Sequence, residues 1–149
     1  MIDMPPVLPD DYPPSAALVE KCTAQAAAHY NLPPLVIMAI AQVEGGKVGT
    51  VSPNSDGSFD FGLMQINSIH LPLIKERFNL GWRDLTYKPC INIAIGSWIL
   101  ATRVRESDDI WTGVGNYHSR TPKFHKGYKE RVLRAYQALL SKSLGLAQR

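Results

Sequence analysis

The sequence predicts a single, mostly helical domain with a small β-like or irregular insert. Its 149 residues suit one compact domain, and 45% hydrophobic with 19% charged residues is a globular composition. Several segments have the apolar spacing or terminating residues of helices, whereas the passage 52–58 is rich in turn residues. No repeat, low-complexity run or linker divides residues 15–149, which we therefore take as one domain.

The first half of the chain predicts an arm and two helices. Residues 1–14 carry five prolines and are expected to form an extended N-terminal arm. A helix follows over 15–30, with Ser15 as its N-cap. Pro33 and Pro34 then open a second helix, in which residues 35–44 are apolar on nearly every side, as is typical of a helix at a domain centre. Gly45 and Gly46 end it.

The second half predicts the insert and four more helices. Residues 52–58, Ser-Pro-Asn-Ser-Asp-Gly-Ser, indicate a loop or short hairpin. Helices are then expected within 67–78 and over about 89–105, 109–117 and 123–140. Trp98 lies on an apolar stripe of the second of these and is assigned to the core. Trp82 and Trp111 are also interpreted as core residues, with a position beside a cleft as the alternative.

The charge pattern only slightly narrows the range of possible binding partners. From Arg103 onward there are ten basic residues against four acidic ones, which suits cell wall, nucleic acid or anionic lipid, or only a solvated helix face. The absence of a zinc finger, a phosphate loop or interleaved aromatic residues argues against nucleic acid. No apolar run approaches the ~20 residues that span a bilayer, so no membrane span is expected.

The two cysteines, Cys22 and Cys90, leave the cellular compartment open. Neither has metal-ligand spacing, so we expect no metal site. In a cytosolic protein they would be buried thiols, and in an exported protein they would pair. The start of the chain has no basic and apolar signal pattern, so either the protein is not exported this way or its signal peptide is missing from the sequence.

Glu44 is the first candidate catalytic residue. It follows the apolar run 35–43, so its helix carries a carboxyl group out of the core. An apolar setting and the negative end of the helix dipole both raise the pKa of a carboxyl group. A carboxylic acid that stays protonated near neutral pH can donate a proton to the leaving oxygen of a glycosidic bond. The alternative is an ordinary solvated carboxylate.

The segment 60–67, Asp-Phe-Gly-Leu-Met-Gln-Ile-Asn, supplies candidate binding groups. Gly62 would allow close approach of backbone or of a sugar ring. Gln65 and Asn67 could hydrogen-bond sugar hydroxyl or acetamido groups, and Met64 could add an adaptable apolar surface.

Three motifs together carry a resemblance to a known family. Val43-Glu44-Gly45, the run 62–67 (Gly-Leu-Met-Gln-Ile-Asn) and the run 116–119 (Asn-Tyr-His-Ser) resemble the lytic transglycosylases of the soluble-transglycosylase, lysozyme-like superfamily. The third motif looks like that of the small members that serve type III and type IV secretion systems and pilus assembly. The similarity covers about residues 18–140.

The resemblance implies an α+β lysozyme-like fold whose insert flanks an active-site cleft. It implies Glu44 as catalytic acid/base, Gly62, Leu63, Met64 and Gln65 in the glycan groove, and Tyr117 holding glutamate and substrate. It also implies a periplasmic location, a Cys22–Cys90 disulfide and peptidoglycan glycan strands as substrate, with a secretion or pilus machine as a partner. We expect a monomer, and no cofactor, since the chemistry needs none.

The run 55–68 also resembles the active-site hairpin of animal c-type lysozymes, with Asp60 at the second catalytic acid. Asp60 is therefore either a catalytic partner of Glu44 or a loop aspartate that orders the turn. Gly45 replaces the serine that many family members carry after the glutamate, and the neighbours of Tyr117 also depart from the common pattern. Two further hypotheses are a lysozyme-like muramidase using Glu44 and Asp60, and a non-catalytic glycan-binding assembly protein.

Overall fold

The computed structural model describes residues 15–147, and the element bounds confirm a mainly helical domain with a small β insert. The elements in chain order are α1 (Ala16–Tyr30), α2 (Pro34–Glu44), β1 (Val51–Pro53), β2 (Phe59–Phe61), β3 (Ile66–Asn67), the 3-10 turn η1 (Ser68–His70), α3 (Leu71–Phe78), α4 (Trp82–Tyr87), α5 (Pro89–Arg105), α6 (Ile110–His118) and α7 (Pro122–Ala147). The arm expected over 1–14 lies outside the described residues, and the domain bounds stay a prediction.

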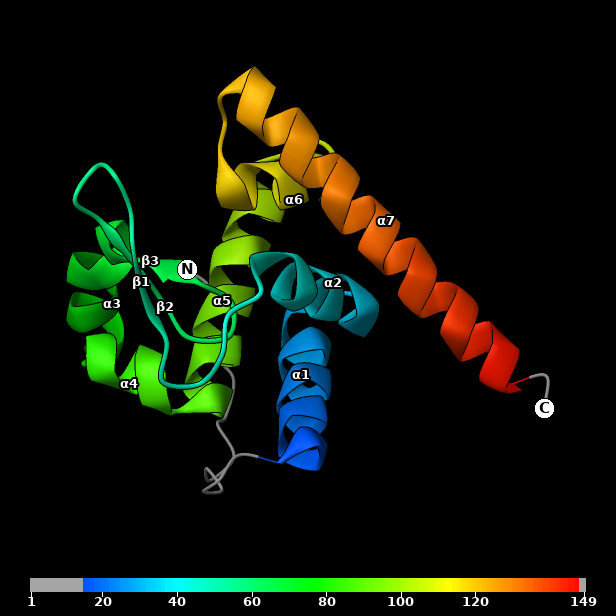
Figure 1. Ribbon diagram of the computed structural model, residues 1–149, viewed down its shortest axis with the longest axis horizontal. Coiled ribbons are helices and arrows are strands. Elements are labelled where there is room, and N and C mark those ends of the chain that lie inside the picture. Colours follow the sequence, from blue (N-terminus) through cyan, green and yellow to red (C-terminus); the bar gives the residue numbers. More distant parts are fainter. Residues whose placement is uncertain (1–14, 148–149) are drawn as a thin grey trace.

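Helix α5 forms the middle of the molecule. Every residue from Pro89 to Ala101 except Ile91 is buried, so the helix is covered on all sides. It contacts α1, α4 and α6, and Figure 1 shows the sheet with α3 and α4 on one side of it and α1, α2 and α7 on the other. The helix therefore joins the small β insert to the larger helical body.

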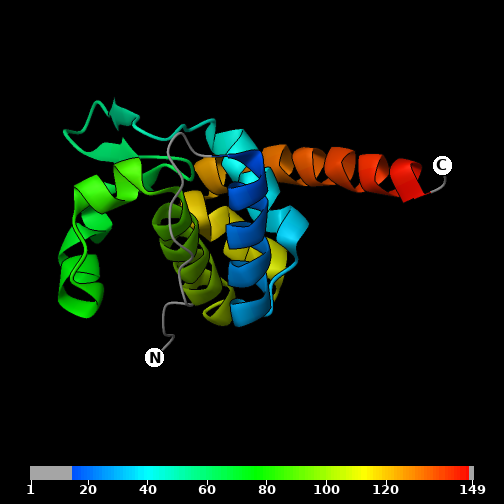
Figure 2. The ribbon, with the colours of Figure 1, turned by 90° about the horizontal axis from the view of Figure 1, so that it is seen from below.

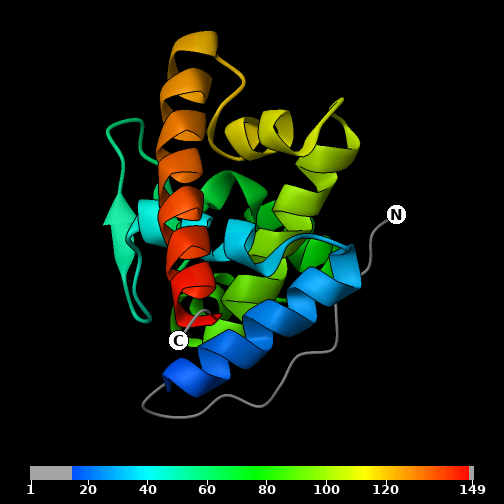
Figure 3. The ribbon, with the colours of Figure 1, turned by 90° about the vertical axis from the view of Figure 1, so that its right-hand side faces the viewer.

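Helix α2 is the buried apolar helix that the sequence predicts. Its core positions are Val36, Ile37, Ala39 and Ile40. It ends because Gly45 adopts a left-handed conformation with φ +68°, from which its N–H bonds to the carbonyl of Ala41. Helix α7 packs across α2, as the view in Figure 3 shows.

The insert is an antiparallel sheet in the order β1-β2-β3. Ser52 pairs with Asp60, and Asp60 pairs with Asn67, which confirms the hairpin alternative for the passage 52–58. The Asp56 carboxylate accepts hydrogen bonds from the backbone N–H and hydroxyl of Ser58, an Asx-type turn that closes the β1-β2 loop.

The expected Cys22–Cys90 disulfide is present. It joins α1 to the first turn of α5, with 5.4 Å between the two Cα atoms and a sequence separation of 68 between the cysteines. In the chain-entropy model, a loop of this length contributes roughly 4 kcal/mol to stability. The bond therefore fixes the N-terminal helix against the central one.

Three expectations need correction or extension. Helix α4 was not predicted, and α7 continues to Ala147 and extends past the other helices (Figure 2). Trp98 is a core residue, as expected, but Trp82 is 38% exposed and stacks on Phe61, so its assignment to the core is wrong.

Within residues 15–147, no helix is both long and apolar enough to cross a membrane.

Candidate active site

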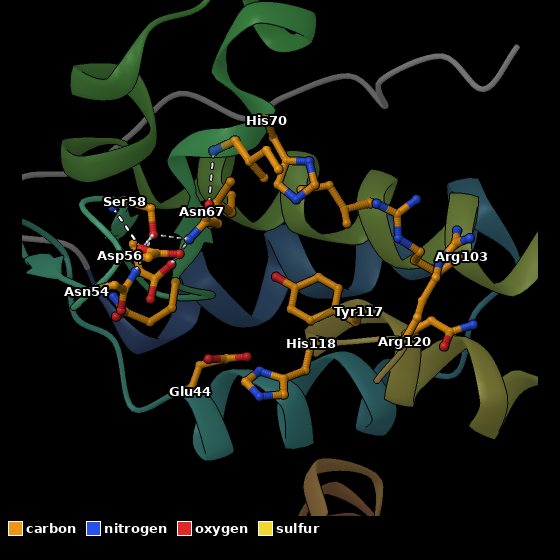
Figure 4. A pocket seen from close by; sticks show the side chains of 16 residues that line it. Glu44, Asn54, Asp56, Ser58, Asn67, His70, Arg103, Tyr117, His118 and Arg120 are labelled. Carbon is orange, nitrogen blue, oxygen red and sulfur yellow. Dashed lines mark hydrogen bonds between the residues drawn. The ribbon is translucent and has the colours of Figure 1, made fainter. Parts of the chain in front are cut away.

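A cavity of about 610 Å³ lies between the β insert and the helical body. Figure 4 shows side chains from both sides pointing into it. Its lining residues are mostly polar: Glu44, Asn54, Asp56, Ser58, Asp60, Gln65, Ile66, Asn67, Ile69, His70, Ile99, Arg103, Asn116, Tyr117, His118 and Arg120. We refer to this cavity as the groove.

Glu44 enters the groove from the last residue of α2. Its Oε2 atom accepts a hydrogen bond of 2.8 Å from the hydroxyl of Tyr128, which is 1% exposed and lies on α7. The chain folds this way locally because Gly45 and Gly46 turn the backbone away at the helix end. A Cβ atom on Gly46 would collide with the carbonyl oxygen of Gly62, so only glycine lets α2 approach the turn 62–65 so closely.

The pKa of Glu44 is raised from 4.5 to about 7. Burial is the largest cause, because a carboxylate loses its hydration there, and the charge of Asp60 raises the pKa further. The hydrogen bond from Tyr128 and the charge of Arg131 act in the opposite direction and are outweighed. Glu44 therefore gains and loses its proton near neutral pH, which suits both donation and acceptance of a proton.

Tyr128 is one of the site residues that the sequence analysis did not identify. Burial and the neighbouring Glu44 hold the pKa of its hydroxyl far above the ordinary range, so it stays a proton-bearing donor. His118 stacks on its ring, with 4.7 Å between ring centroids. A signal existed in the sequence: Tyr128, Val132, Ala135 and Leu139 form a helical apolar stripe, and a buried tyrosine hydroxyl needs a partner.

Asn92, on the first turns of α5, holds the turn 62–65 in place. Its side chain is 1% exposed; it accepts a hydrogen bond from the N–H of Met64 and donates to the carbonyls of Phe61 and Leu85. Gly62 has φ +67°, and a Cβ atom there would collide with the Asn92 amide. The close approach that Gly62 permits is thus to Asn92, not to a sugar ring.

Asp60 lies at the middle of β2 and also lines the groove. Its Oδ1 accepts a hydrogen bond of 2.9 Å from Asn67, whose amide also donates to the Ser58 hydroxyl. Both amide hydrogens of Asn67 are engaged in this way, so Asn67 orders the sheet around Asp60. Asp60 therefore lines the groove and, through its charge, raises the pKa of Glu44.

Tyr117 projects from α6 into the groove (Figure 4). Its hydroxyl donates a 3.0 Å hydrogen bond to the carbonyl of Met64, across the groove floor. The resemblance implies that Tyr117 helps to hold the glutamate, but the tyrosine that hydrogen-bonds Glu44 is Tyr128. Tyr117 ties α6 to the turn 62–65, and burial together with Glu44 raises the pKa of its hydroxyl well above 10.

The structure brings Glu44, Asp60, Gln65, Asn67 and Tyr117 to one groove. The Gln65 side chain also donates to the carbonyl of Gly62, which closes the turn. That these residues touch a glycan stays a prediction.

Met64 and Leu63 require correction. The Met64 side chain is 0% exposed and fills the space above Gly96, so the expectation that it offers a surface to substrate is wrong. Leu63 packs against the hydrophobic core and is not among the residues that line the groove. Leu63 and Met64 anchor the turn 62–65 in the core. Their burial fixes the position of the polar Gln65, which lies between them and β3 in the chain.

The groove is lined by ionisable and hydrogen-bonding side chains in the part of the chain that the structure describes. Over residues 15–147, no group of three or more His, Cys, Asp or Glu side chains is arranged to hold a metal ion. What the groove offers is the Glu44 carboxyl group with a pKa of about 7, the carboxyl groups of Asp56 and Asp60, and several amide, hydroxyl and guanidinium groups.

Comparison with known proteins shows a family match over most of the chain. Residues 21–138 match the family described as transglycosylase SLT domain. The chain is 35% identical over 123 residues to the invasion protein IagB of Salmonella typhimurium, covering 79% of this chain and 76% of that protein. It is 31% identical over 129 residues to protein IpgF of Shigella flexneri, covering 82% and 83% respectively.

A peptidoglycan-binding-like protein of Escherichia coli O157:H7 is 37% identical over 105 residues, or 66% of this chain and 63% of that protein. The match to the family extends from α1 into α7 and so includes both sides of the groove. With its mainly helical, lysozyme-like fold and small β insert, the chain belongs to the transglycosylase SLT domain family.

Proposed function

We propose that this protein is a peptidoglycan lytic transglycosylase that cleaves the β-1,4 bond between N-acetylmuramic acid and N-acetylglucosamine and leaves a 1,6-anhydro end. The observation that carries the proposal is the Glu44 carboxyl group, whose pKa is raised to about 7 at the wall of a polar groove. An acid of this strength can serve as general acid and general base in one reaction at neutral pH.

In this mechanism the proton of Glu44 passes to the glycosidic oxygen as its bond to C1 of the muramic acid residue breaks. The resulting carboxylate then accepts the proton of the C6 hydroxyl, whose oxygen forms the new bond to C1. No water is consumed, and Glu44 ends in its starting protonation state. The Tyr128 hydroxyl holds Oε2 throughout and favours the carboxylate that forms between the two steps.

A lysozyme-like hydrolase is the second candidate, and Asp60 favours it. This carboxylate lines the same groove as Glu44 and raises its pKa through charge. A second carboxylate can stabilise a glycosyl cation or form a bond to it, after which water completes the cleavage. The product then has a reducing end in place of the anhydro ring.

The test is mass spectrometry of the muropeptides released from purified peptidoglycan by the wild type and by Glu44→Gln, Asp60→Asn and Glu76→Gln. Glu76 is an exposed carboxylate on α3 outside the groove, so its variant is a matched control. We expect anhydro products from the wild type and the control, and at least a ~100-fold loss with Glu44→Gln.

Reducing-end products that need both Glu44 and Asp60 would instead establish the hydrolase. Cleavage that survives in Glu44→Gln would contradict both candidates, because each depends on that proton.

We further propose that the enzyme acts in the periplasm and opens the cell wall for a secretion or pilus machine. The Cys22–Cys90 disulfide supports an oxidising compartment. The relative IagB is an invasion protein, which supports a role beside a machine that crosses the wall.

A further inference from the structure

The groove is divided by charge along its length. Glu44, Asp56 and Asp60 are its acidic residues, and Arg103 and Arg120 are its arginines. Figure 4 shows Glu44 and Asp56 toward one end and the two arginines toward the other, with Tyr117 between them. A neutral sugar chain would give the arginine end no charge to bind, so the division points to a substrate that carries anionic groups at a distance from the scissile bond.

The two arginines are held in position by a shared partner. The Glu106 carboxylate accepts a 2.6 Å hydrogen bond from Arg120, and the same oxygen lies 3.6 Å from Nη1 of Arg103. One carboxylate thus balances two guanidinium groups, and about one positive charge is left over. The Arg103 side chain is only 24% exposed, so its position is fixed by its surroundings.

The positive surface continues beyond the groove. A second cavity of about 350 Å³ shares His70, Ile99 and Arg103 with the groove. Its other charged lining residues are Arg77, Arg105 and Glu106, so three arginines face one carboxylate there. A chain that branched from a bound glycan near Arg103 would therefore meet further guanidinium groups as it led away from Glu44.

His70, between the two cavities, contributes no charge to this surface at neutral pH. Burial and the nearby Arg103 lower the pKa of its imidazole. The attraction for anions there comes from the arginines alone, and guanidinium groups suit carboxylates because their paired N–H donors match the two oxygens.

We propose that Arg103 and Arg120 form a subsite for the carboxylates of the peptide stems that branch from the glycan strand. The proposal rests on the function proposed above, since it assigns the stem-bearing strand as the substrate class of that groove. Peptide stems are attached through the lactyl group of muramic acid and carry free carboxylates, so they supply anions off the sugar backbone.

The experiment measures binding to the Glu44→Gln protein, so that it does not depend on cleavage. Isothermal titration compares three soluble oligosaccharides of equal length: one with peptide stems, one with its stem carboxylates converted to amides, and one without stems, in which the lactyl carboxylate is free. We expect the stem-bearing oligosaccharide to bind about tenfold more tightly than the amidated one.

Variants then test the assignment on the same Glu44→Gln background. The measured quantity is the affinity for the stem-bearing oligosaccharide divided by the affinity for the amidated one. Arg103→Gln and Arg120→Gln should each lower this ratio at least about threefold, whereas Arg103→Lys should keep part of the preference for the stem-bearing oligosaccharide. Arg134→Gln is the matched control, because Arg134 is exposed on α7 and lines neither cavity. Thermal unfolding of each variant identifies any loss of fold.

Two results would overturn the subsite. Equal affinities for all three oligosaccharides would show that the arginines bind no substrate carboxylate. Tight, arginine-dependent binding of the stem-free strand would assign them to the lactyl carboxylate instead. Because binding is read without cleavage, either failure is separate from a failure of the muropeptide experiment, which tests the transglycosylase itself.

Discussion

Two opposing effects act on the carboxyl group of Glu44. The hydrogen bond from Tyr128 favours the charged form, and burial between α2 and α7 favours the neutral form. Burial is the larger effect, which is why the pKa of Glu44 lies near 7 and not below its ordinary value. The hydrogen bond from Tyr128 therefore reduces the rise in the pKa of Glu44 that burial causes.

Replacing Tyr128 by phenylalanine should raise the pKa of Glu44 further, since a bond that favours the carboxylate is lost while burial remains. The rate falls on the alkaline side as Glu44 loses its proton, so a higher pKa moves that fall to higher pH. We expect this displacement in the pH profile of kcat/KM, with a stability loss of about 1 kcal/mol.

The control for Tyr128→Phe is Tyr117→Phe. The Tyr117 hydroxyl donates to the Met64 carbonyl and not to Glu44, so its removal should leave the alkaline midpoint in place, whatever it does to the rate. An alkaline midpoint that stays unchanged in Tyr128→Phe would contradict the role assigned to that hydroxyl.

At the residue scale, the sequence predicts the proposed catalytic acid, Glu44, better than it predicts the residues around it. Glu44 is recognisable because the nine residues before it are all apolar except Gln42 and place it at the end of a helix that packs into the core. Tyr128 lies 84 residues away, and only tertiary packing shows that its hydroxyl reaches Glu44. Met64 was misassigned because an apolar residue inside a polar motif can face either a ligand or the core, and here Gly96 leaves room in the core.

Among the elements, α5 has the largest effect on the geometry of the site. Helix α5 lies beside the β insert and carries Asn92. The three hydrogen bonds of the Asn92 side chain fix the positions of β2, the turn 62–65 and α4 near Leu85. The orientation of Gln65 and the carbonyl that receives the Tyr117 hydroxyl both depend on that turn.

We expect Asn92→Ala to destabilise the domain by about 3 kcal/mol or more, because it leaves one N–H and two carbonyl groups buried without their partner. Urea unfolding followed by circular dichroism measures the loss.

Ser97→Ala provides a control on the same helix. The Ser97 hydroxyl is fully buried and has no hydrogen-bond partner within the described range. Its removal should change stability by no more than about 0.5 kcal/mol, or increase it. A comparable loss in both variants would mean that burial in α5, not the Asn92 hydrogen bonds, determines the effect.

The predicted elements agree with the structure where the sequence is periodic. Helices α1, α2, α5 and α6 lie close to their predicted bounds, because their apolar spacing or caps are clear. Helix α4 has six residues, too few to show a period, and each strand has two or three. Such short elements are stabilised by their neighbours, and the Asn92 contact to Leu85 is one example.

At the scale of the whole molecule, the groove is a long-range assembly. One wall comes from α2 and α6, the other from the sheet and η1, and α5 spans the distance between them. The sequence indicates each wall through its own motif, but the depth of the groove and its division by charge depend on how the walls face each other. That arrangement follows from core packing around α5, which no local pattern specifies.

The partly buried position of Glu44 also links its proposed catalytic role to the stability of the fold. Its carboxyl group has a pKa of about 7 in the folded chain and about 4.5 in the unfolded chain, so the folded state binds more protons between these pH values. The free energy of unfolding should therefore fall as pH rises from 4.5 to 7, by at most about 3 kcal/mol from this group.

Glu44→Gln removes this dependence. Urea midpoints measured at pH 4 and pH 8 should show the variant gaining on the wild type as pH rises, whereas parallel changes in the two proteins would contradict the linkage. The proton that Glu44 is proposed to give to the glycosidic oxygen is then also a proton that stabilises the fold. Mild acid should both protonate Glu44 for the reaction and make the protein harder to unfold.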